Sequence, residues 1–207
     1  MRLSKTRATL PRAFVAEHQR RRVVDAMAVL AHDWGIEEVT VSMLCKQAHM
    51  SRATFYGHFD GSKEFREYAV GDAFTRIFDG VRQPGETWTE RLRSGLTSLF
   101  HAVAEDPLMA ELALVHSSFV GNEESGYGRE GAVARIGGMF EDPPSSRPAR
   151  RPLLEEYVSR MIVALLIRRI LQERTHELPE EVDDLVLIAR RYFETGSPAS
   201  PSSSPRR

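Results

Sequence analysis

The sequence predicts an all-α protein in which an N-terminal three-helix unit of helix-turn-helix type precedes a larger C-terminal helical domain. Apolar residues recur at helical spacing along most of the chain, and no stretch alternates with the period of two that marks a strand. Two short amphipathic segments separated by a tight turn lie between residues 40 and 63. The expected organisation is a basic flexible arm at 1–13, the helix-turn-helix domain at 14–61, the larger helical domain at 62–195 and a disordered tail at 196–207.

The first helix is expected at residues 14–34, and Gly35 is expected to end it. One side of this helix carries Val23, Met27, Leu30, Ala31 and Trp34. A short helix then starts after Thr40, whose hydroxyl can cap the first turn. Its apolar residues share one face at spacings of three and four: Val41, Leu44, Cys45 and Ala48.

The turn after this short helix is expected at His49, because His is among the residues that tolerate a left-handed backbone. Ser51 is a second candidate N-cap, and the helix that it opens buries Phe55 and Phe59 at a spacing of four. The exposed side of this second helix is expected to carry Arg52, Ala53, Thr54, Tyr56, Gly57 and His58. In helix-turn-helix proteins, the N-terminal part of the second helix touches the bases of DNA.

These residues give the first third of the chain a resemblance to the TetR family of bacterial transcriptional regulators. The resemblance is carried by Arg22, Val23, Ala26, Leu30 and Ala31, by Gly35, by Thr40-Val41, by the segment from Ser51 to Phe59 that reads SRATFYGHF, and by Lys63-Glu64. The chain departs from the family in having His49 where Gly is usual, Cys45 where Ala is usual, and one extra residue before Lys63.

The resemblance implies a homodimeric regulator that binds double-stranded DNA at a palindromic operator. Arg52 can donate two hydrogen bonds to guanine, and Thr54 and Tyr56 suit phosphate oxygens. The expected DNA-contacting residues are Arg20, Thr40, Ser42, Ser51, Arg52, Ala53, Thr54, Tyr56, His58 and Lys63.

Charge and composition agree with this interpretation. The chain has a net charge of -1, but residues 1–22 hold seven basic side chains and one acidic side chain, a local charge of +6. Such an arm suits DNA phosphates, and its alternative is a solvated tail that aids solubility. No run approaches the roughly 20 apolar residues that span a bilayer, and the N-terminus lacks the apolar centre of a secretion signal, so a cytoplasmic location is expected. Cys45 is expected to act as a small hydrophobe rather than a redox sensor.

Helical periodicity continues beyond the turn region. A helix from about Ser62 is expected to connect the two domains, and others are expected at 87–105, from Pro107 to Phe119, weakly at 130–140, at 153–176 and at 179–194. Loops rich in Gly and Pro are expected within 121–152. The last two helices are apolar on more than one face, which favours a dimer interface, although they could instead complete the monomer's own core.

A ligand between these helices could change the separation of the two DNA-contacting helices in a dimer. The candidate lining residues suit an apolar or aromatic molecule, and each could equally be ordinary core packing: Trp88, Phe100, His101, Met109, His116, Phe119, Tyr127 and Met161. No catalytic motif and no paired His-carboxylate metal signature is present, so we expect neither enzyme activity nor a cofactor. The leading hypothesis is a repressor that a small molecule releases from DNA, and the alternative is a DNA-tethered module whose C-terminal domain binds a protein partner.

Overall fold

The computed structural model describes residues 11–119, 126–141 and 152–193, and every regular element among them is helical. The expected arm at residues 1–10 and the expected tail lie outside the described residues, as do parts of the loops expected within 121–152. The elements are α1 (Arg12–Trp34), α2 (Val41–Gln47), α3 (Arg52–Tyr56), α4 (Ser62–Phe78), α5 (Trp88–Glu105), α6 (Pro107–Leu114), η1 (His116–Phe119), α7 (Gly128–Gly137), η3 (Gly138–Phe140), α8 (Pro152–Leu171), η4 (Thr175–Glu181) and α9 (Val182–Phe193).

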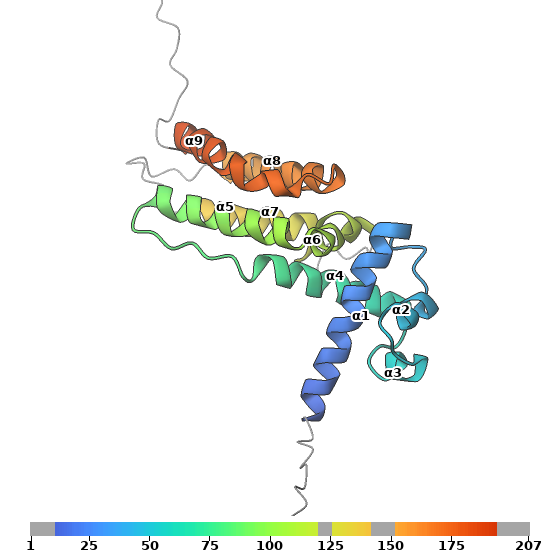
Figure 1. The fold of residues 1–207 in the computed structure, drawn as a ribbon. Helices are drawn as coiled ribbons and strands as arrows, with labels where there is room; N and C mark the ends of the chain where they lie inside the picture. Colours follow the sequence, from blue (N-terminus) through green and yellow to red (C-terminus); the bar gives the residue numbers. More distant parts are fainter. Residues whose placement is uncertain (1–10, 120–125, 142–151, 194–207) are drawn as a thin grey trace, which may run out of the picture.

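The helices from α4 to α9 form three layers, with α8 and α9 on one side, α5, α6 and α7 in the middle, and α4 on the other side (Figure 1). We call these helices the C-terminal domain, and α1, α2 and α3 the N-terminal unit. Helix α1 crosses beneath the middle layer and packs against both α2 and α6. This arrangement leaves α3 at the end of the molecule farthest from α8 and α9 (Figure 1).

Helix α1 begins two residues earlier than expected and ends where Gly35 was expected to end it. Gly35 has φ of 81°, and its N–H donates to the carbonyl of Ala31. The prediction for Trp34 was wrong, since this side chain is 64% exposed. Ile36 and Val39, in the segment after the helix, are buried in the core instead. Because Trp34 is the final residue of α1, its side chain extends past the surface against which the rest of the helix packs.

Helix α4 contributes buried side chains both to the N-terminal unit and to the C-terminal domain. Its first turns contribute Phe65 to the core of the N-terminal unit, and its last turns contribute Phe74 and Phe78, whose rings stack at 4.4 Å between centroids. Between them lies Gly71, which the Tyr127 ring approaches so closely that a Cβ at this position would lie 3.0 Å from it. The expected connecting helix is therefore confirmed as one continuous element, which the N-terminal unit and the C-terminal domain share.

The middle layer begins at Thr87, whose hydroxyl and Glu90 form a capping box at the start of α5. The prediction of a single helix from Pro107 to Phe119 was wrong. Helix α6 ends at Leu114, whose carbonyl accepts hydrogen bonds from the Ser117 hydroxyl and the Arg129 side chain. The chain turns there into η1, which leaves Phe119 exposed.

The layer of α8 and α9 differs from expectation mainly at the ends of its helices. The helix expected at 153–176 stops at Leu171, and the segment expected to open the last helix is the separate 3-10 helix η4. Buried residues of α8 include Val158, Ile162 and Leu166, and those of α9 include Leu185 and Val186. Both helices also expose large apolar side chains on their other face: Leu153, Tyr157, Met161 and Leu171 from α8, and Leu187 and Ile188 from α9.

Candidate nucleic-acid interface

Two capped helix starts define the α2–turn–α3 segment, and both were expected from the sequence. The Thr40 hydroxyl accepts from the N–H of Met43 at 3.3 Å, and the Ser51 hydroxyl accepts from the N–H of Thr54 at 3.0 Å. Each cap satisfies an amide that the first helical turn leaves unpaired. Both predicted N-caps are thus confirmed.

The turn between the two helices is fixed by its backbone conformation and by α1. His49 has φ of 49°, which confirms the left-handed residue expected there. The Arg22 guanidinium of α1 donates to the carbonyls of Ala48 and His49, which lie at the end of α2. A cation at the C-terminal end of a helix is favoured by the helix dipole. Sequence reasoning gave Arg22 no structural role, because its acceptors are 26 and 27 residues away.

An aromatic cluster holds α3 against α4. The ring of Phe55 lies 5.4 Å from that of Phe59 and 5.3 Å from that of Phe65, and Phe59 and Phe65 are 4.8 Å apart. All three side chains are buried, as the spacing of Phe55 and Phe59 predicted. Since a five-residue helix has little stability of its own, this packing is what fixes its orientation.

The outer surface of α3 carries polar groups that can face a duplex. Arg52, Ala53 and Tyr56 are exposed, and the Arg52 guanidinium donates to the Ser42 hydroxyl of α2 at 2.6 Å. The Thr54 hydroxyl is 2.9 Å from that of Ser51, so either can act as the donor. This surface, made of Ser42, Arg52, Ala53 and Tyr56, is called the reading surface below.

His58 does not share this exposed surface, contrary to expectation. Its ring is half-buried, and Nε2 lies 2.8 Å from the amide oxygen of Gln19 in α1. The chain turns at Gly57, so His58 points back to the first helix rather than along α3. Gln19 is a structural partner that sequence reasoning missed, since a polar residue on α1 has no local feature that marks it.

Two further expected DNA-contacting residues come from α1 and α4. Arg20 lies on α1, where it pairs with Glu17 at 3.4 Å. Lys63 is exposed in the first turn of α4, immediately after the extra residue. Glu64 accepts a hydrogen bond from the N–H of Asp60 and so fixes the entry to α4.

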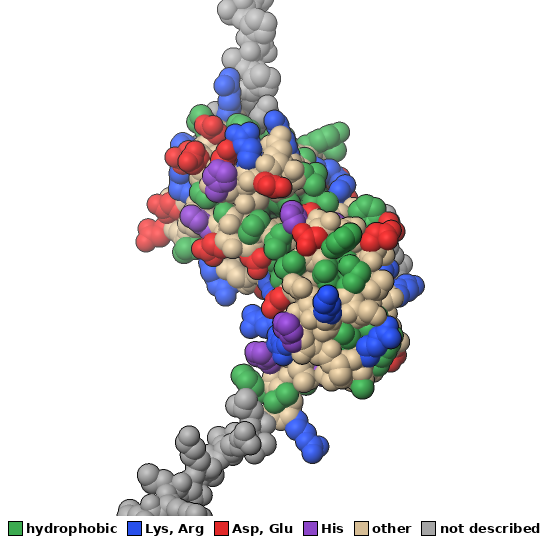
Figure 2. All heavy atoms as spheres, turned by 45° about the vertical axis from the view of Figure 1, so that its right-hand side comes forward, with side chains coloured by type: hydrophobic (Ala, Val, Ile, Leu, Met, Phe, Trp, Pro, Cys, Tyr) green, Lys and Arg blue, Asp and Glu red, His purple; other side chains and the backbone are tan. Residues whose placement is uncertain are grey.

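The charge around the reading surface favours a polyanion. From Thr40 to Phe59 the chain contains Lys46 and Arg52 and no acidic residue. Figure 2 shows the red Asp and Glu side chains mostly over the upper part of the molecule, while Lys, Arg and His predominate over the lower part. An uneven distribution of this kind can steer DNA to one end of a protein whose net charge is near zero.

Comparison with known proteins places this segment in a family. Residues 23–65, which run from the middle of α1 into α4, match the family model of bacterial regulatory proteins, tetR family. Residues 23–65 are thus a TetR-type segment. The match spans the capped turn and the aromatic cluster, but it does not reach the C-terminal domain.

Two curated proteins extend the TetR-family likeness. The HTH-type transcriptional repressor KstR of Rhodococcus jostii is 29% identical over 96 residues, which are 46% of this chain and 45% of that protein. The uncharacterized HTH-type transcriptional regulator YxbF of Bacillus subtilis is 24% identical over 198 residues, 93% of this chain and 45% of its own. The matched regions thus span less than half the length of these curated relatives.

A solved structure shows that the likeness in fold extends to the C-terminal domain. A TetR family transcription regulator from Marinobacter aquaeolei VT8 superposes with a TM-score of 0.65 at 19% identity, covering 86% of this chain and 96% of its own. At this identity the likeness concerns the fold alone. It agrees with the all-α, two-part architecture expected from the sequence.

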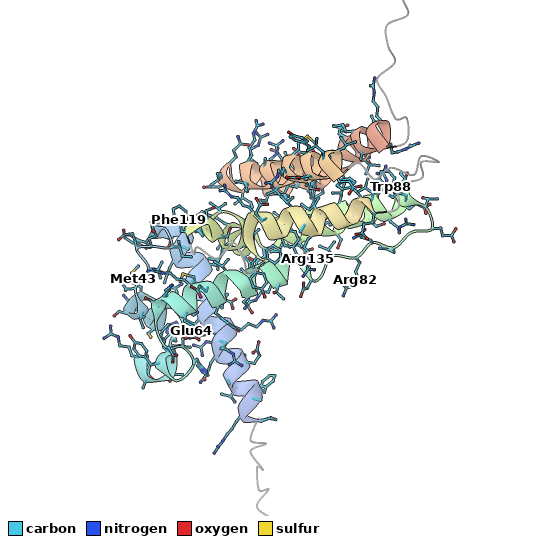
Figure 3. All side chains as sticks on the ribbon, turned by 180° about the vertical axis from the view of Figure 1, so that it is seen from behind. Met43, Glu64, Arg82, Trp88, Phe119 and Arg135 are labelled. Atoms are coloured by element: carbon cyan, nitrogen blue, oxygen red, sulfur yellow. The ribbon has the colours of Figure 1, made fainter. Side chains whose placement is uncertain are left out.

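The residues expected to line a ligand site do not form one group. Trp88, Phe100, Met109 and His116 are buried, whereas His101, Phe119, Tyr127 and Met161 are exposed. Figure 3 shows Trp88 and Phe119 at opposite ends of the C-terminal domain. Within α5 alone, Trp88 and Phe100 are roughly 18 Å apart along the axis. His101 is exposed because the buried face of α5 passes through Leu96, Leu99 and Phe100.

Within residues 11–119, 126–141 and 152–193, no group of three or more His, Cys, Asp or Glu side chains is placed to hold a metal ion. Over the same ranges, none of the helices has the length and apolar character needed to cross a membrane.

Proposed function

We propose that this protein is a homodimeric transcriptional regulator that binds a palindromic operator and that a small molecule releases it from DNA. In this proposal, residues 14–61 and the basic arm at 1–13 bind DNA. Residues 62–195 bind the ligand and form the dimer. The TetR-type segment, together with a relative named as a transcriptional repressor, supports this proposal.

The observation that carries the proposal is the geometry of the reading surface. A short helix, capped at Ser51 and packed through Phe55, lies at one end of the molecule with its polar side outward. The major groove of DNA admits a helix, and the first turn of such a helix reaches the base edges. Arg52 stands at the first position of α3, where it can donate two hydrogen bonds to a guanine.

The exposed faces of α8 and α9 support the proposed dimer. Tyr157 and Leu187 are each 65% exposed, although both are large and apolar or aromatic. Large apolar side chains exposed on both helices are typical of a protein–protein interface, and a two-fold dimer pairs the same face of both subunits. Both helices lie far from α3, so a dimer formed through them leaves both reading surfaces free (Figure 1).

Selection of bound sequences from random duplex DNA tests the proposal directly. We expect enrichment of an inverted repeat whose half-sites are about 34–36 Å apart, or a multiple of that distance, because one helical turn separates equivalent groove positions. Enrichment of a single half-site, or of no sequence at all, would contradict the proposed dimeric operator binding.

Arg52→Ala is expected to remove discrimination at one base pair of each half-site. The loss should amount to about 1–3 kcal/mol per half-site, the range for a bidentate arginine–guanine contact. It is measured by competition between the selected operator and operators altered at each position in turn. Affinity for unrelated duplex DNA serves as the internal control. A sequence preference identical to that of the parent would show that another residue reads this base pair.

Lys63→Ala is expected to weaken binding to all DNA sequences by a similar factor. A lysine on a phosphate releases counterions, so its removal should lower the slope of log affinity against log salt by about 0.9. Titrations at four or more salt concentrations measure this slope. Glu67→Ala, which removes a charge one turn further along α4, is the control. If the Lys63→Ala slope equalled the parent's, the extra residue before Lys63 would have moved this side chain away from the phosphate.

A thermal shift screen with apolar and aromatic metabolites tests the ligand part of the proposal. A ligand that prefers the folded protein raises its melting temperature. The proposed inducer should also reduce operator affinity, because it must favour a different arrangement of the two reading surfaces. A compound that stabilises the protein and leaves operator affinity unchanged is not an inducer.

A further inference from the structure

Two histidines from different parts of the chain meet one carboxylate. Nδ1 of His32, near the end of α1, donates to Oε2 of Glu111 in α6 at 2.7 Å. On the other side, Nε2 of His116 in η1 lies 3.4 Å from Oε1 of Glu111, at ion-pair distance but outside hydrogen-bond geometry. The sequence gives no sign of this group, because His32 and Glu111 are 79 residues apart.

The position of Glu111 makes this cluster a link between the two parts of the protein. Helix α1 packs against α2, which in turn contacts α3, and it also packs against α6 of the C-terminal domain. The Glu111 side chain is 15% exposed, and His116 is buried. A charge so placed interacts more strongly with its partners than it would at the surface. The state of the cluster therefore affects how firmly α1 is held to α6.

The surroundings of His32 favour its protonated form. Among the described residues, the charged groups that act on this ring are all acidic: Glu111 from α6, Asp33 from α1 itself and Glu173 from the turn after α8. The hydrogen bond to Glu111 is the main reason that the pKa of His32 is raised above its ordinary value of 6.5.

Glu111 is held in its charged form by the same contacts. His116, followed by His32, lowers the pKa of Glu111 below its ordinary value of 4.5, against burial, which raises it. Around His116 itself, Glu111 approaches from α6, and the Arg129 side chain of α7 donates to the neighbouring carbonyl of Leu114.

We propose that His32 and Glu111 form a proton-controlled link that fixes the N-terminal unit to the C-terminal domain, with His116 holding Glu111 in place. When His32 is protonated, the link is a charge-assisted hydrogen bond, which is stronger than its neutral counterpart. When His32 loses its proton, α1 is held less firmly and the reading surface gains freedom relative to α6. The protein would then respond to pH as well as to a ligand.

The pH dependence of the link follows from the ionisation of His32 and of Glu111. Because the pKa of His32 is raised by folding, its contribution to stability is full below 6.5 and is lost as the pH rises through the raised value. Because the pKa of Glu111 is lowered by folding, its contribution is full above 4.5 and is lost as the pH falls through the lowered value. The link is therefore strongest between pH 4.5 and 6.5, and it weakens as the pH rises through the raised pKa of His32.

NMR titration of the histidine rings in the full chain tests the link without DNA. His32 should titrate above 6.5 in the parent and at a clearly lower pH in Glu111→Gln, which keeps the shape of the side chain and removes its charge. The His32→Gln variant identifies the resonance. An unchanged His32 titration in Glu111→Gln, in a variant that melts cooperatively, would overturn the proposal.

Operator affinity measured at pH 6 and at pH 8.5 tests the consequence, and this part rests on the proposed DNA binding. A reading surface that is already held in place loses less freedom on binding, so affinity should be higher at pH 6. His32→Gln should remove the part of this pH dependence that comes from the link, because the variant lacks the group that gains and loses the proton.

His176→Gln is the matched control, because this side chain is 75% exposed on η4 and should leave the pH dependence as in the parent. Parallel pH profiles for the parent and His32→Gln would overturn the proposed link. If the protein bound no operator at all, the proposed function would fail, and the NMR titration would still decide whether the link exists.

Discussion

Phe55→Ala is expected to lower the free energy of unfolding by about 3–5 kcal/mol, the range for removing a buried aromatic side chain. Phe55 is fully buried and is the residue through which α3 contacts both Phe59 and Phe65. Its loss leaves a cavity beneath a helix of five residues that cannot hold its shape alone. Urea denaturation followed by circular dichroism measures the change.

Tyr56→Ala is the matched control for stability. This neighbouring ring packs edge-on against Phe55 but is 54% exposed, so its removal should cost about 1 kcal/mol or less. Operator binding should be lost in Phe55→Ala even at temperatures where most of the chain remains helical. Equal destabilisation by the two substitutions would mean that the aromatic cluster does not hold α3 in place.

Leu187→Glu is expected to separate the proposed dimer into monomers. The substitution places a charge on the exposed apolar face of α9, where burial against a partner subunit would strip it of water. A monomer holds one half-site at a time, so affinity for the full operator should fall by about 100-fold or more, since linked binding raises avidity by factors of 10²–10⁴. Analytical ultracentrifugation measures the oligomeric state.

Trp34→Glu makes the same kind of change at a residue of equal exposure, 64% against 65%, at the end of α1. It should leave the oligomeric state as in the parent. Dissociation by Trp34→Glu but not by Leu187→Glu would place the interface on another surface and would remove the support that α8 and α9 give to the proposed dimer.

Local features of the N-terminal unit could be predicted because they depend on residues close together in the chain. The caps at Thr40 and Ser51, the left-handed residue at His49 and the end of α1 at Gly35 each follow from the conformational preferences of one or two side chains. The burial of Phe55 and Phe59 follows from their spacing, because a spacing of four places both rings on one face of a helix.

The features that the sequence could not predict depend on distant contacts. His58 turns toward Gln19, 39 residues earlier, and the end of α6 is set partly by Arg129, 15 residues later. The ligand candidates are scattered over the C-terminal domain for a similar reason. Aromatic and Met side chains occur at helical spacing in any core, and only the packing of α5 to α8 decides that His101 and Met161 face outward.

The continuity of α4 has a consequence for protein engineering. Since Phe65 and Phe78 belong to one uninterrupted helix, the chain offers no linker at which the DNA-contacting half could be exchanged for that of a relative. A chimaeric sensor would have to be joined inside this helix, in register, so that each graft brings its own aromatic rings to the correct side. To give this protein a new DNA specificity, the rotational position of the joined segment around the axis of α4 must therefore be preserved, and lengthening or shortening a linker would not help.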